Sequence, residues 1–257
     1  MTEDLTGWIG RSVTRHDVVS ARIAAEFRAT LSPFIFEAQC PPGLHWALAP
    51  AIPAPNDIGP DGAEAMGVFL PPLPFHRRMW AGGEIETIAP LEIGMAVTRR
   101  SVISQIRMRE TLCIISIQHD ISAEGRLLIR ERQDLAFTND PPKQGTPSSQ
   151  PIAPSFTPTA LLLFRFSALT FNGHRIHYDA DYAKAEGYEG PVVQGALQAA
   201  LLFNLAATEQ GRIPKHFTYR CLAPLIAGTP VALMMQNGEG AIQTEAGVVT
   251  ITASATG

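Results

Sequence analysis

Hydrophobic positions recur with two different periods in the first half of the chain. Near the N-terminus, apolar residues recur at every fourth position and would lie on one face of a helix: Val19, Ile23, Phe27 and Leu31. Thr14-x-x-Asp17 precedes this stripe and can cap a helix that carries it. From Glu84 onward, β-favouring residues dominate and predict strands at 84–89, 95–106, 111–121 and 126–137. We therefore expect a helix followed by an antiparallel sheet.

The second half repeats this outline. Residues 160–170 are apolar and predict a strand, whereas residues 195–209 predict a helix that ends at Gly211. This helix is apolar nearly all round, so we expect a sheet that curls around it. Further strands are predicted to supply that sheet, at 216–223, 230–236 and 246–254. Helices and strands that do not alternate along the chain predict an α+β fold.

A proline-rich segment separates the two halves. Residues 139–158 contain six prolines and no regular apolar period, which is the composition of an extended connector. The sequence thus predicts an N-terminal unit at 1–140, a linker at 141–157 and a C-terminal unit at 158–257. A chain of 257 residues is long enough for two such units.

Composition favours a globular protein of the cytoplasm. Hydrophobic residues make up 46% of the chain and charged residues 17%, which is enough apolar material for a sizeable core. The 20 basic and 24 acidic residues are intermixed, so nucleic acid is not an expected partner. The three cysteines are far apart, and no segment approaches 18 uninterrupted apolar residues. The polar N-terminus also lacks the features of a signal peptide. We expect neither a membrane segment nor disulfides.

The densest group of polar side chains directly follows segment 160–170: Asn172, His174, Arg175, His177 and Asp179. An unperturbed imidazole has a pKa of about 6.5, so a histidine beside a pocket can both accept and return a proton. A solvated loop whose histidines cap backbone groups is the alternative interpretation. His174 and His177 are also candidate metal ligands, but there is no H-E-x-x-H motif and no third ligand at a recognisable spacing. We therefore expect no metal site.

A second candidate site lies where helix 195–209 is predicted to begin. Free amides at a helix N-terminus carry partial positive charge, and a glycine lets a ligand approach the backbone closely. The amide of Gly195 can therefore stabilise negative charge that develops on an oxygen of a bound ligand. The alternative interpretation is that Gly195 only permits a tight turn.

These stretches resemble one superfamily of enzymes. TFNGHRIHYDADYA at 170–183 and VVQGALQAALL at 192–202 are similar to the hydratase and dehydratase branch of the MaoC-like hot-dog superfamily. PPGLHWALAP at 41–50, FHRRMWAGGEIETIAPLEIG at 75–94 and RERQDLAF at 130–137 resemble the mesaconyl-C4-CoA and itaconyl-CoA hydratases and the type 2 hydroxyacyl-thioester dehydratases. The resemblance covers most of the chain.

The resemblance implies a double hot dog, in which two antiparallel sheets each wrap a long central helix. It also implies reversible hydration of an α,β-unsaturated acyl thioester. In this hypothesis His177 is the general acid and base, the Gly195 amide is the oxyanion donor, and Asn172 holds the water. The acyl-CoA thioester is the substrate, and no cofactor is implied.

Two departures from the broad MaoC-like pattern concern the same site. That pattern has aspartate and asparagine where this chain has Asn172 and His174, which puts a second, carboxylate acid/base in doubt. The branch that this chain most resembles carries asparagine there as well. Gln194 stands where many relatives have histidine before the glycine, and we expect this change to adjust the pocket rather than abolish activity.

The predicted substrate-binding residues are Arg175, His174, Gln194, Arg78 and Trp80. Arginine binds phosphate in a bidentate manner, so Arg175 and Arg165 are candidates for CoA binding, although Arg165 is better explained as a surface or packing residue. Arg78 and Trp80 can line the acyl or CoA channel, or they can be surface and core residues. Asp179 is expected to cap the turn 179–186 rather than to brace His177.

Two other functions stay open. A hot-dog thioesterase would direct water at the carbonyl carbon, and the Asn172/His177 pairing argues against it. A catalytically silent acyl-CoA-binding module would explain Gln194 and the missing carboxylate at position 172. A homodimer of the double unit is expected, although two hot dogs in one chain also allow a monomer.

Overall fold

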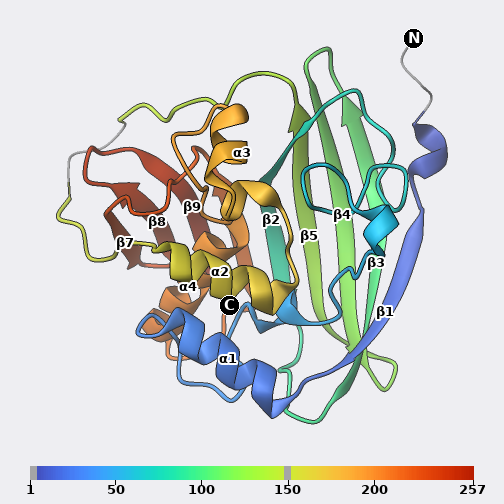
Figure 1. Ribbon diagram of the computed structural model, residues 1–257. Coiled ribbons are helices and arrows are strands. Elements are labelled where there is room, and N and C mark those ends of the chain that lie inside the picture. Colours follow the sequence, from blue (N-terminus) through green and yellow to red (C-terminus); the bar gives the residue numbers. More distant parts are fainter. Residues whose placement is uncertain (1–4, 148–151) are drawn as a thin grey trace.

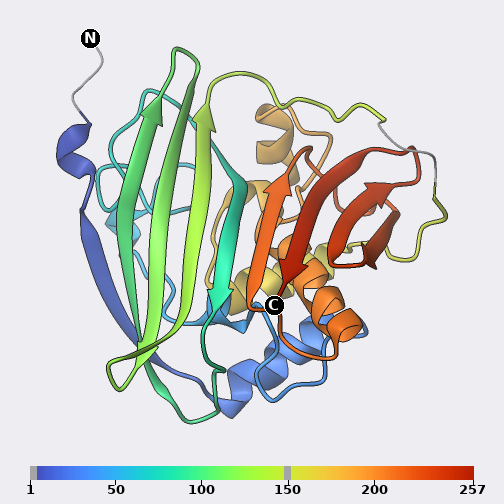
Figure 2. The ribbon, with the colours of Figure 1, turned by 180° about the vertical axis from the view of Figure 1, so that it is seen from behind.

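The strands of the protein form one continuous sheet. The computed structural model describes residues 5–147 and 152–257, so residues 148–151 of the predicted linker lie outside the described part. The sheet has nine antiparallel strands in the order β1-β3-β4-β5-β2-β6-β9-β8-β7. The helices gather on one face of this sheet (Figure 1), and the strands lie in front of them when the molecule is seen from behind (Figure 2).

The N-terminal half supplies β1 (Ser12–Val18) and the four longest strands, which are β2 (Arg77–Thr87), β3 (Ala96–Met108), β4 (Leu112–Ala123) and β5 (Arg126–Thr138). The strands predicted from Glu84 to residue 137 are confirmed, with β2 beginning seven residues earlier than expected. β1 was not predicted as a strand.

The predicted cap of the first helix is wrong. Thr14 and Asp17 lie in β1, and helix α1 (Ala21–Leu31) begins after Ser20, whose hydroxyl accepts a hydrogen bond from the Ile23 amide at 3.2 Å. A serine at this position satisfies a free amide of the first turn as Thr14 was expected to do. The carboxylate of Asp17 instead accepts from the Ala49 amide at 2.7 Å.

Residues 160–170 form a helix, so the strand predicted there is wrong. Helix α2 (Ala160–Thr170) is capped by Thr159, whose hydroxyl accepts from the Leu162 amide at 3.2 Å. Leucine, alanine and phenylalanine dominate it, and of these leucine and alanine are strong helix formers. A short apolar run does not by itself distinguish a strand from a buried helix, which is why the period failed here.

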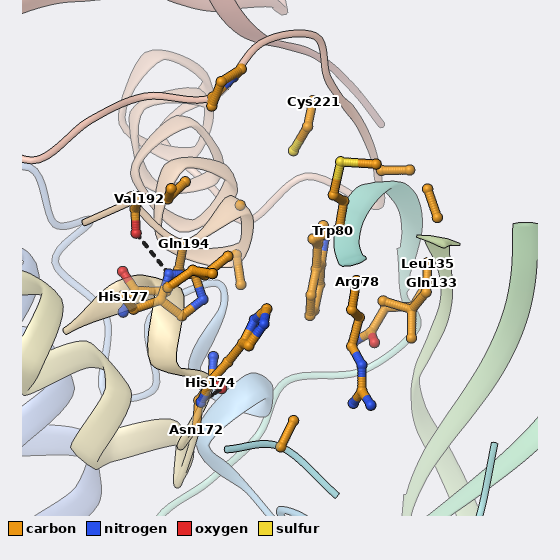
Figure 3. Close-up of a pocket in the computed structure, with 18 of the residues that line it drawn as sticks. Arg78, Trp80, Gln133, Leu135, Asn172, His174, His177, Val192, Gln194 and Cys221 are labelled. Atoms are coloured by element: carbon orange, nitrogen blue, oxygen red, sulfur yellow. Dashed lines mark hydrogen bonds between the residues drawn. The ribbon is translucent and has the colours of Figure 1, made fainter. Parts of the chain in front are cut away.

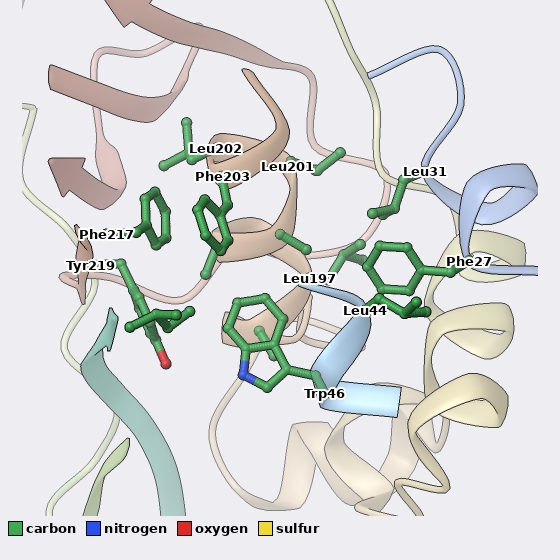
Figure 4. Packing of buried hydrophobic residues seen from close by; sticks show 14 of the residues in the cluster. Phe27, Leu31, Leu44, Trp46, Leu197, Leu201, Leu202, Phe203, Phe217 and Tyr219 are labelled. Atoms are coloured by element: carbon green, nitrogen blue, oxygen red, sulfur yellow. The ribbon is translucent and has the colours of Figure 1, made fainter. Parts of the chain in front are cut away.

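The predicted helix at 195–209 is confirmed as α4 (Gly195–Gln210), which ends at Gly211 in a left-handed conformation. Eleven of its sixteen residues are buried. On one side, Leu197 and Leu201 pack near Phe27 and Leu31 of α1, and Phe203 on the other side stacks on Phe217 of β6 (Figure 4). The expectation that this helix would be enclosed is therefore correct.

The strands of the C-terminal half are β6 (His216–Cys221), β7 (Val231–Gln236), β8 (Glu239–Thr244) and β9 (Val249–Thr256). β6, β7 and β9 match the three predicted strands, whereas β8 was not predicted. The remaining short elements are η1 (Thr6–Trp8), η2 (Leu44–Ala47), η3 (Pro55–Asp57), η4 (Arg175–His177) and α3 (Ala180–Ala185). Within the described residues, no helix reaches the length and apolarity needed to cross a membrane.

The expectation of two sheets that each wrap a long helix needs correction. β2 pairs with β6, from Gly82↔Arg220 to Glu86↔His216, and this seam joins the two halves into one sheet. α4 is the long buried helix, whereas α1 has eleven residues and packs on α2 and η2. Irregular chain between α1 and β2, at 32–76, occupies much of the remaining space in the N-terminal half.

Two glycines permit the close approach of the halves at this seam. A β-carbon on Gly82 would lie 2.6 Å from the Tyr219 carbonyl oxygen, and one on Gly83 would lie 2.6 Å from the Tyr219 hydroxyl oxygen. The register of β2 also shifts between Trp80 and Gly82. Such a bulge re-aims the side chains beside it. The division into units at 1–140 and 158–257 stays a prediction.

Candidate active site

A cavity of about 800 Å³ lies between the two halves of the molecule. Its walls include His177, Asn172 and Gly195 from the C-terminal half, and Arg78 and Trp80 from β2. Figure 3 shows Trp80 and Arg78 on one side of this space, with His174 and His177 facing them from the other. The structure therefore brings together residues that are up to 117 positions apart in the chain, counted from Arg78 to Gly195.

His177 ends the short helix η4, and its ring is fixed by the backbone. Nδ1 lies 2.7 Å from the carbonyl oxygen of Val192. Because a carbonyl can only accept, Nδ1 must carry the proton, and Nε2 is left as an unprotonated acceptor. Burial lowers the pKa of His177 to about 4, partly offset by the bond to Val192. At neutral pH His177 is thus a neutral imidazole with one free lone pair.

Asn172 and His174 form a tight turn beside this ring. The side-chain oxygen of Asn172 accepts from the His174 amide at 3.0 Å, which leaves its side-chain NH₂ without a partner in the described part of the chain. The rings of His174 and His177 meet edge to face, with centroids 5.4 Å apart. Burial, and next the neighbouring His177, hold the pKa of His174 well below its usual value. Both histidines therefore stay neutral together.

The start of α4 lies on the same cavity. Gln194 precedes the first helical residue and makes no side-chain cap, so the first turn keeps free amides. The Gln194 side chain instead donates to the Leu163 carbonyl and to the Ser167 hydroxyl, both at 2.9 Å, and so ties α4 to α2. A β-carbon on Gly195 would lie 3.1 Å from Cys221 Sγ and from Trp80 Cβ. This crowding explains why a glycine stands at the helix start.

Asp61 is a polar residue of the site that the sequence did not single out. Its Oδ2 lies 3.6 Å from Arg78 Nη2 and 3.9 Å from His174 Nε2. It reaches this position because the loop around Gly62 touches the turn at Gly173: a β-carbon on Gly62 would lie 2.2 Å from the Gly173 carbonyl oxygen. Pro60-Asp61-Gly62 signals a turn in the sequence, but its distance from His174 is a product of the fold.

Arg175, a predicted substrate-binding residue, is not brought to the cavity, and Arg165 lies on the surface as expected. Arg175 binds Asp179 at 2.7 Å and the Pro60 carbonyl at 3.2 Å, and its guanidinium stacks on Tyr182. Arg165 is exposed on α2. Neither residue is among those that line the cavity. Asp179 caps α3 by accepting from the Tyr182 amide at 3.0 Å, as predicted.

The remaining cations of the cavity are Arg99, Lys143 and Arg220. Arg99 lies on β3 and makes long hydrogen bonds to His119 Nδ1 at 3.4 Å and to the Leu48 carbonyl at 3.5 Å. Lys143 and Arg220 are exposed. Within residues 5–147 and 152–257, no three or more His, Cys, Asp and Glu side chains gather in a way that could hold a metal ion.

Comparison with known proteins gives matches in both sequence and structure. Residues 43–227 match the model of the family "hydroxyacyl-thioester dehydratase type 2". The mesaconyl-C(4)-CoA hydratase of Chloroflexus aurantiacus is 36% identical over 260 residues, which is 95% of this chain and 92% of that protein.

Two solved structures support the fold. A MaoC-like dehydratase from Phytophthora capsici superposes with a TM-score of 0.70 at 14% identity and covers 96% of this chain and 95% of its own. A Mycobacterium tuberculosis protein described as a double hot-dog fold superposes with a TM-score of 0.58 at 8% identity, with 96% of each chain covered. The predicted α+β double hot-dog fold is thus confirmed, with the correction that one sheet runs through both halves.

Proposed function

The chain belongs to the type 2 hydroxyacyl-thioester dehydratase family, and from this premise we propose that it catalyses reversible hydration of an α,β-unsaturated acyl-CoA thioester. One observation carries the assignment of residues. A neutral histidine with a free Nε2 and the uncapped start of a buried helix line the same cavity. A base and an oxyanion donor are the two groups that addition of water beside a thioester requires.

In the proposed reaction, Nε2 of His177 removes a proton from water as the water oxygen bonds to the β-carbon. The π electrons of the double bond move onto the thioester oxygen, where the Gly195 amide stabilises the enolate. His177 then returns the proton to the α-carbon, so the imidazole is neutral at the start and at the end. Dehydration follows the same steps in reverse.

Asn172 is proposed to position the water. Its side-chain oxygen is engaged by the His174 amide, so the NH₂ group is the part that can donate to the water oxygen. The exposed Lys143 and Arg220 at the cavity are suited to the phosphates of CoA. Gln194 holds α4 against α2 through its side-chain NH₂. It also lines the cavity, and its contact with the substrate stays a prediction.

The test is to follow the absorbance of the enoyl-thioester band with crotonyl-CoA and with mesaconyl-C4-CoA. A hydratase bleaches this band without releasing thiol, a thioesterase releases thiol, and a silent binding module does neither. His177→Ala should lower kcat for hydration by roughly 10²- to 10⁴-fold, because a positioned acid/base supplies about that factor.

His216→Ala is the matched control, since His216 is an exposed histidine on β6 outside the cavity. It should keep wild-type kcat. Thiol release by the wild-type protein, or full hydratase activity in His177→Ala, would refute the proposal. A homodimer stays a prediction, and light scattering of the purified protein measures it directly.

A further inference from the structure

Arg78 presents unused hydrogen-bond donors at the cavity. Its Nη2 donates to the Glu64 carbonyl at 3.0 Å and lies 3.4 Å from Met66 Sδ. Its Nε is fully buried without a partner, so the donor that a ligand in the cavity can meet is Nη1, which has no hydrogen bond in the described part of the chain. Burial lowers the pKa of Arg78, and next Asp61 opposes that shift. A guanidinium in this position is charged, poorly hydrated and only partly satisfied.

Asp61 forms an ion pair with this guanidinium from outside the cavity. The carboxylate lies 3.6 Å from Arg78 Nη2 and is not among the groups that line the cavity, whereas Arg78 is. One oxygen of Asp61 also accepts from the Ala63 amide at 3.1 Å, which fixes the carboxylate in its turn. Asp61 therefore orients Arg78 from outside the lining of the cavity, and Nη1 is the group of this guanidinium that is left for a second anion.

Among the arginines of the cavity, Arg78 is connected to the proposed catalytic His177 through a short series of side-chain contacts. Asp61 Oδ2 lies within 4 Å of both Arg78 Nη2 and His174 Nε2. His174 in turn meets the ring of His177 edge to face at 5.4 Å. Figure 3 shows Arg78 beside Trp80, across the pocket from these rings. An anion bound by Arg78 thus shares the cavity with a double bond that is positioned at His177.

We propose that Arg78 binds a free carboxylate on the acyl group, so that the preferred substrate is the CoA monothioester of an unsaturated dicarboxylic acid. This assignment rests on the proposed hydratase function and adds the group that sets its specificity. A buried donor that the substrate leaves unpaired costs free energy, so a site of this kind discriminates against an acyl group without the carboxylate.

The other cations of the cavity fit this role less well. Arg99 is engaged with His119 and the Leu48 carbonyl, and it has no contact with Asp61, His174 or His177. Lys143 and Arg220 are exposed, so water screens their charges. Arg99 is still an arginine on the same cavity, which makes it the matched comparison for Arg78.

The experiment compares kcat/KM for mesaconyl-C4-CoA, which carries a carboxylate near its double bond, with kcat/KM for crotonyl-CoA, which has none. Arg78→Met should lower the first by roughly 10- to 150-fold, the usual range for one lost hydrogen bond to a charged group, and change the second less than about threefold. Arg78→Lys should recover part of the loss. Arg99→Met should leave the ratio of the two values close to that of the wild type.

A binding measurement on the wild-type chain covers the case in which Arg78→Met does not fold. Succinyl-CoA and butyryl-CoA differ by the carboxylate and have no double bond to hydrate. As competitive inhibitors of crotonyl-CoA hydration, succinyl-CoA should bind at least tenfold more tightly. Equal inhibition would refute the carboxylate site.

The outcomes separate the two proposals. A wild-type protein that hydrates neither thioester refutes the proposed function and this inference with it. A protein that hydrates both, and whose preference is unchanged in Arg78→Met or is instead lost in Arg99→Met, refutes the inference and leaves the hydratase in place.

Discussion

The two halves of the sheet bury polar groups in different ways. In the C-terminal half, His174 and His177 are held neutral by burial, next to a helix that is apolar on nearly every side. In the N-terminal half, the fully buried Glu131 stays charged: burial alone would raise its pKa, but His45 and other neighbours lower it to about 2. The half with the long helix thus provides a neutral base, and the half without it provides fixed charges.

This difference follows from what fills each half. α4 occupies the hollow of its own strands, and no aspartate, glutamate, lysine or arginine is among the buried polar residues described in that half. In the N-terminal half the irregular segment 32–76 brings Trp46, His45 and Asp61 over the sheet, where they meet side chains of β5 and β2. In the proposed mechanism, the C-terminal half supplies the catalytic groups and the N-terminal half supplies the arginine that selects the acyl group. The following predictions test that division.

After His177→Ala, the largest effect is expected at the start of α4. Gly195→Ala would add a β-carbon 3.1 Å from Cys221 Sγ and Trp80 Cβ, so the helix start must shift away from the thioester oxygen. We expect kcat for hydration to fall by about 10²-fold, the usual loss for one oxyanion donor, with KM changed much less. Gly7→Ala, where nothing lies within 4 Å, is the control. Unchanged kcat would remove Gly195 from the mechanism.

Breaking the contact between the two loops should come next. Gly62 has a φ of +82°, and a β-carbon added there would lie 2.2 Å from the Gly173 carbonyl oxygen. Gly62→Ala therefore combines backbone strain with a clash. We expect the free energy of unfolding to fall by about 3 kcal/mol and hydration to slow, because Asp61 moves with the loop. Gly10→Ala has a similar φ of +85 but open space, so it isolates the strain, expected at about 1 kcal/mol. Urea denaturation of both variants measures the difference.

Gln194→Leu should weaken the anchor between α4 and α2. The substitution removes two hydrogen bonds, to the Leu163 carbonyl and the Ser167 hydroxyl, and replaces them with a side chain of similar size. We expect a loss of about 2 kcal/mol in the free energy of unfolding and a smaller decrease in kcat than in Gly195→Ala. A variant that is inactive yet fully stable would give Gln194 a direct role toward the substrate.

The pH dependence of hydration should be shallow above pH 5. Neutral His177 is the active form in both directions, and its pKa is lowered to about 4, so kcat/KM should stay level from pH 8 to about pH 5 and fall as pH drops through 4. The free energy of unfolding should change in the same direction. His177 takes up a proton near pH 6.5 in the unfolded chain and only near pH 4 in the folded chain, so the free energy of unfolding falls as the pH drops from 6.5 to 4. A kinetic midpoint near 6.5 would place another group in control.

The smallest effect is expected in the N-terminal half away from the cavity. Ser20→Ala removes the cap of α1 and should cost about 1 kcal/mol of unfolding free energy, with kcat and KM unchanged. Thermal unfolding and the hydration assay together test this. A change in kcat would mean that α1 influences the site, which would weaken the division between the halves.

The residues of the proposed chemistry were visible in the sequence because they are close together along the chain. His177 and Asn172 lie in one short polar cluster, and Gly195 marks the start of an all-apolar helix. Arg78 and Trp80 stood out as an unusual pair next to two glycines. Asp61 could not be predicted, because its role depends on a backbone contact between loops from opposite halves.

The errors in the fold have a common cause. The apolar run of α2 predicts a strand, and Thr14-x-x-Asp17 in β1 predicts a helix cap. Both predictions fail because the local pattern of a short segment does not distinguish a helix from a strand. The long, strongly patterned elements β3, β4, β5 and α4 were identified correctly. The joining of two sheets into one is a property of β2 and β6 together, and no single segment of sequence carries it.

The pairing of β2 with β6 limits which changes of sequence the protein can tolerate. Backbone hydrogen bonds at this junction, and not the path of the proline-rich connector, set how Trp80 faces Gly195. Insertions or deletions in the connector therefore leave the alignment of the two walls intact. A single methyl group added at Gly82 or Gly83 would instead push the walls apart, so we expect natural variation to avoid these two positions.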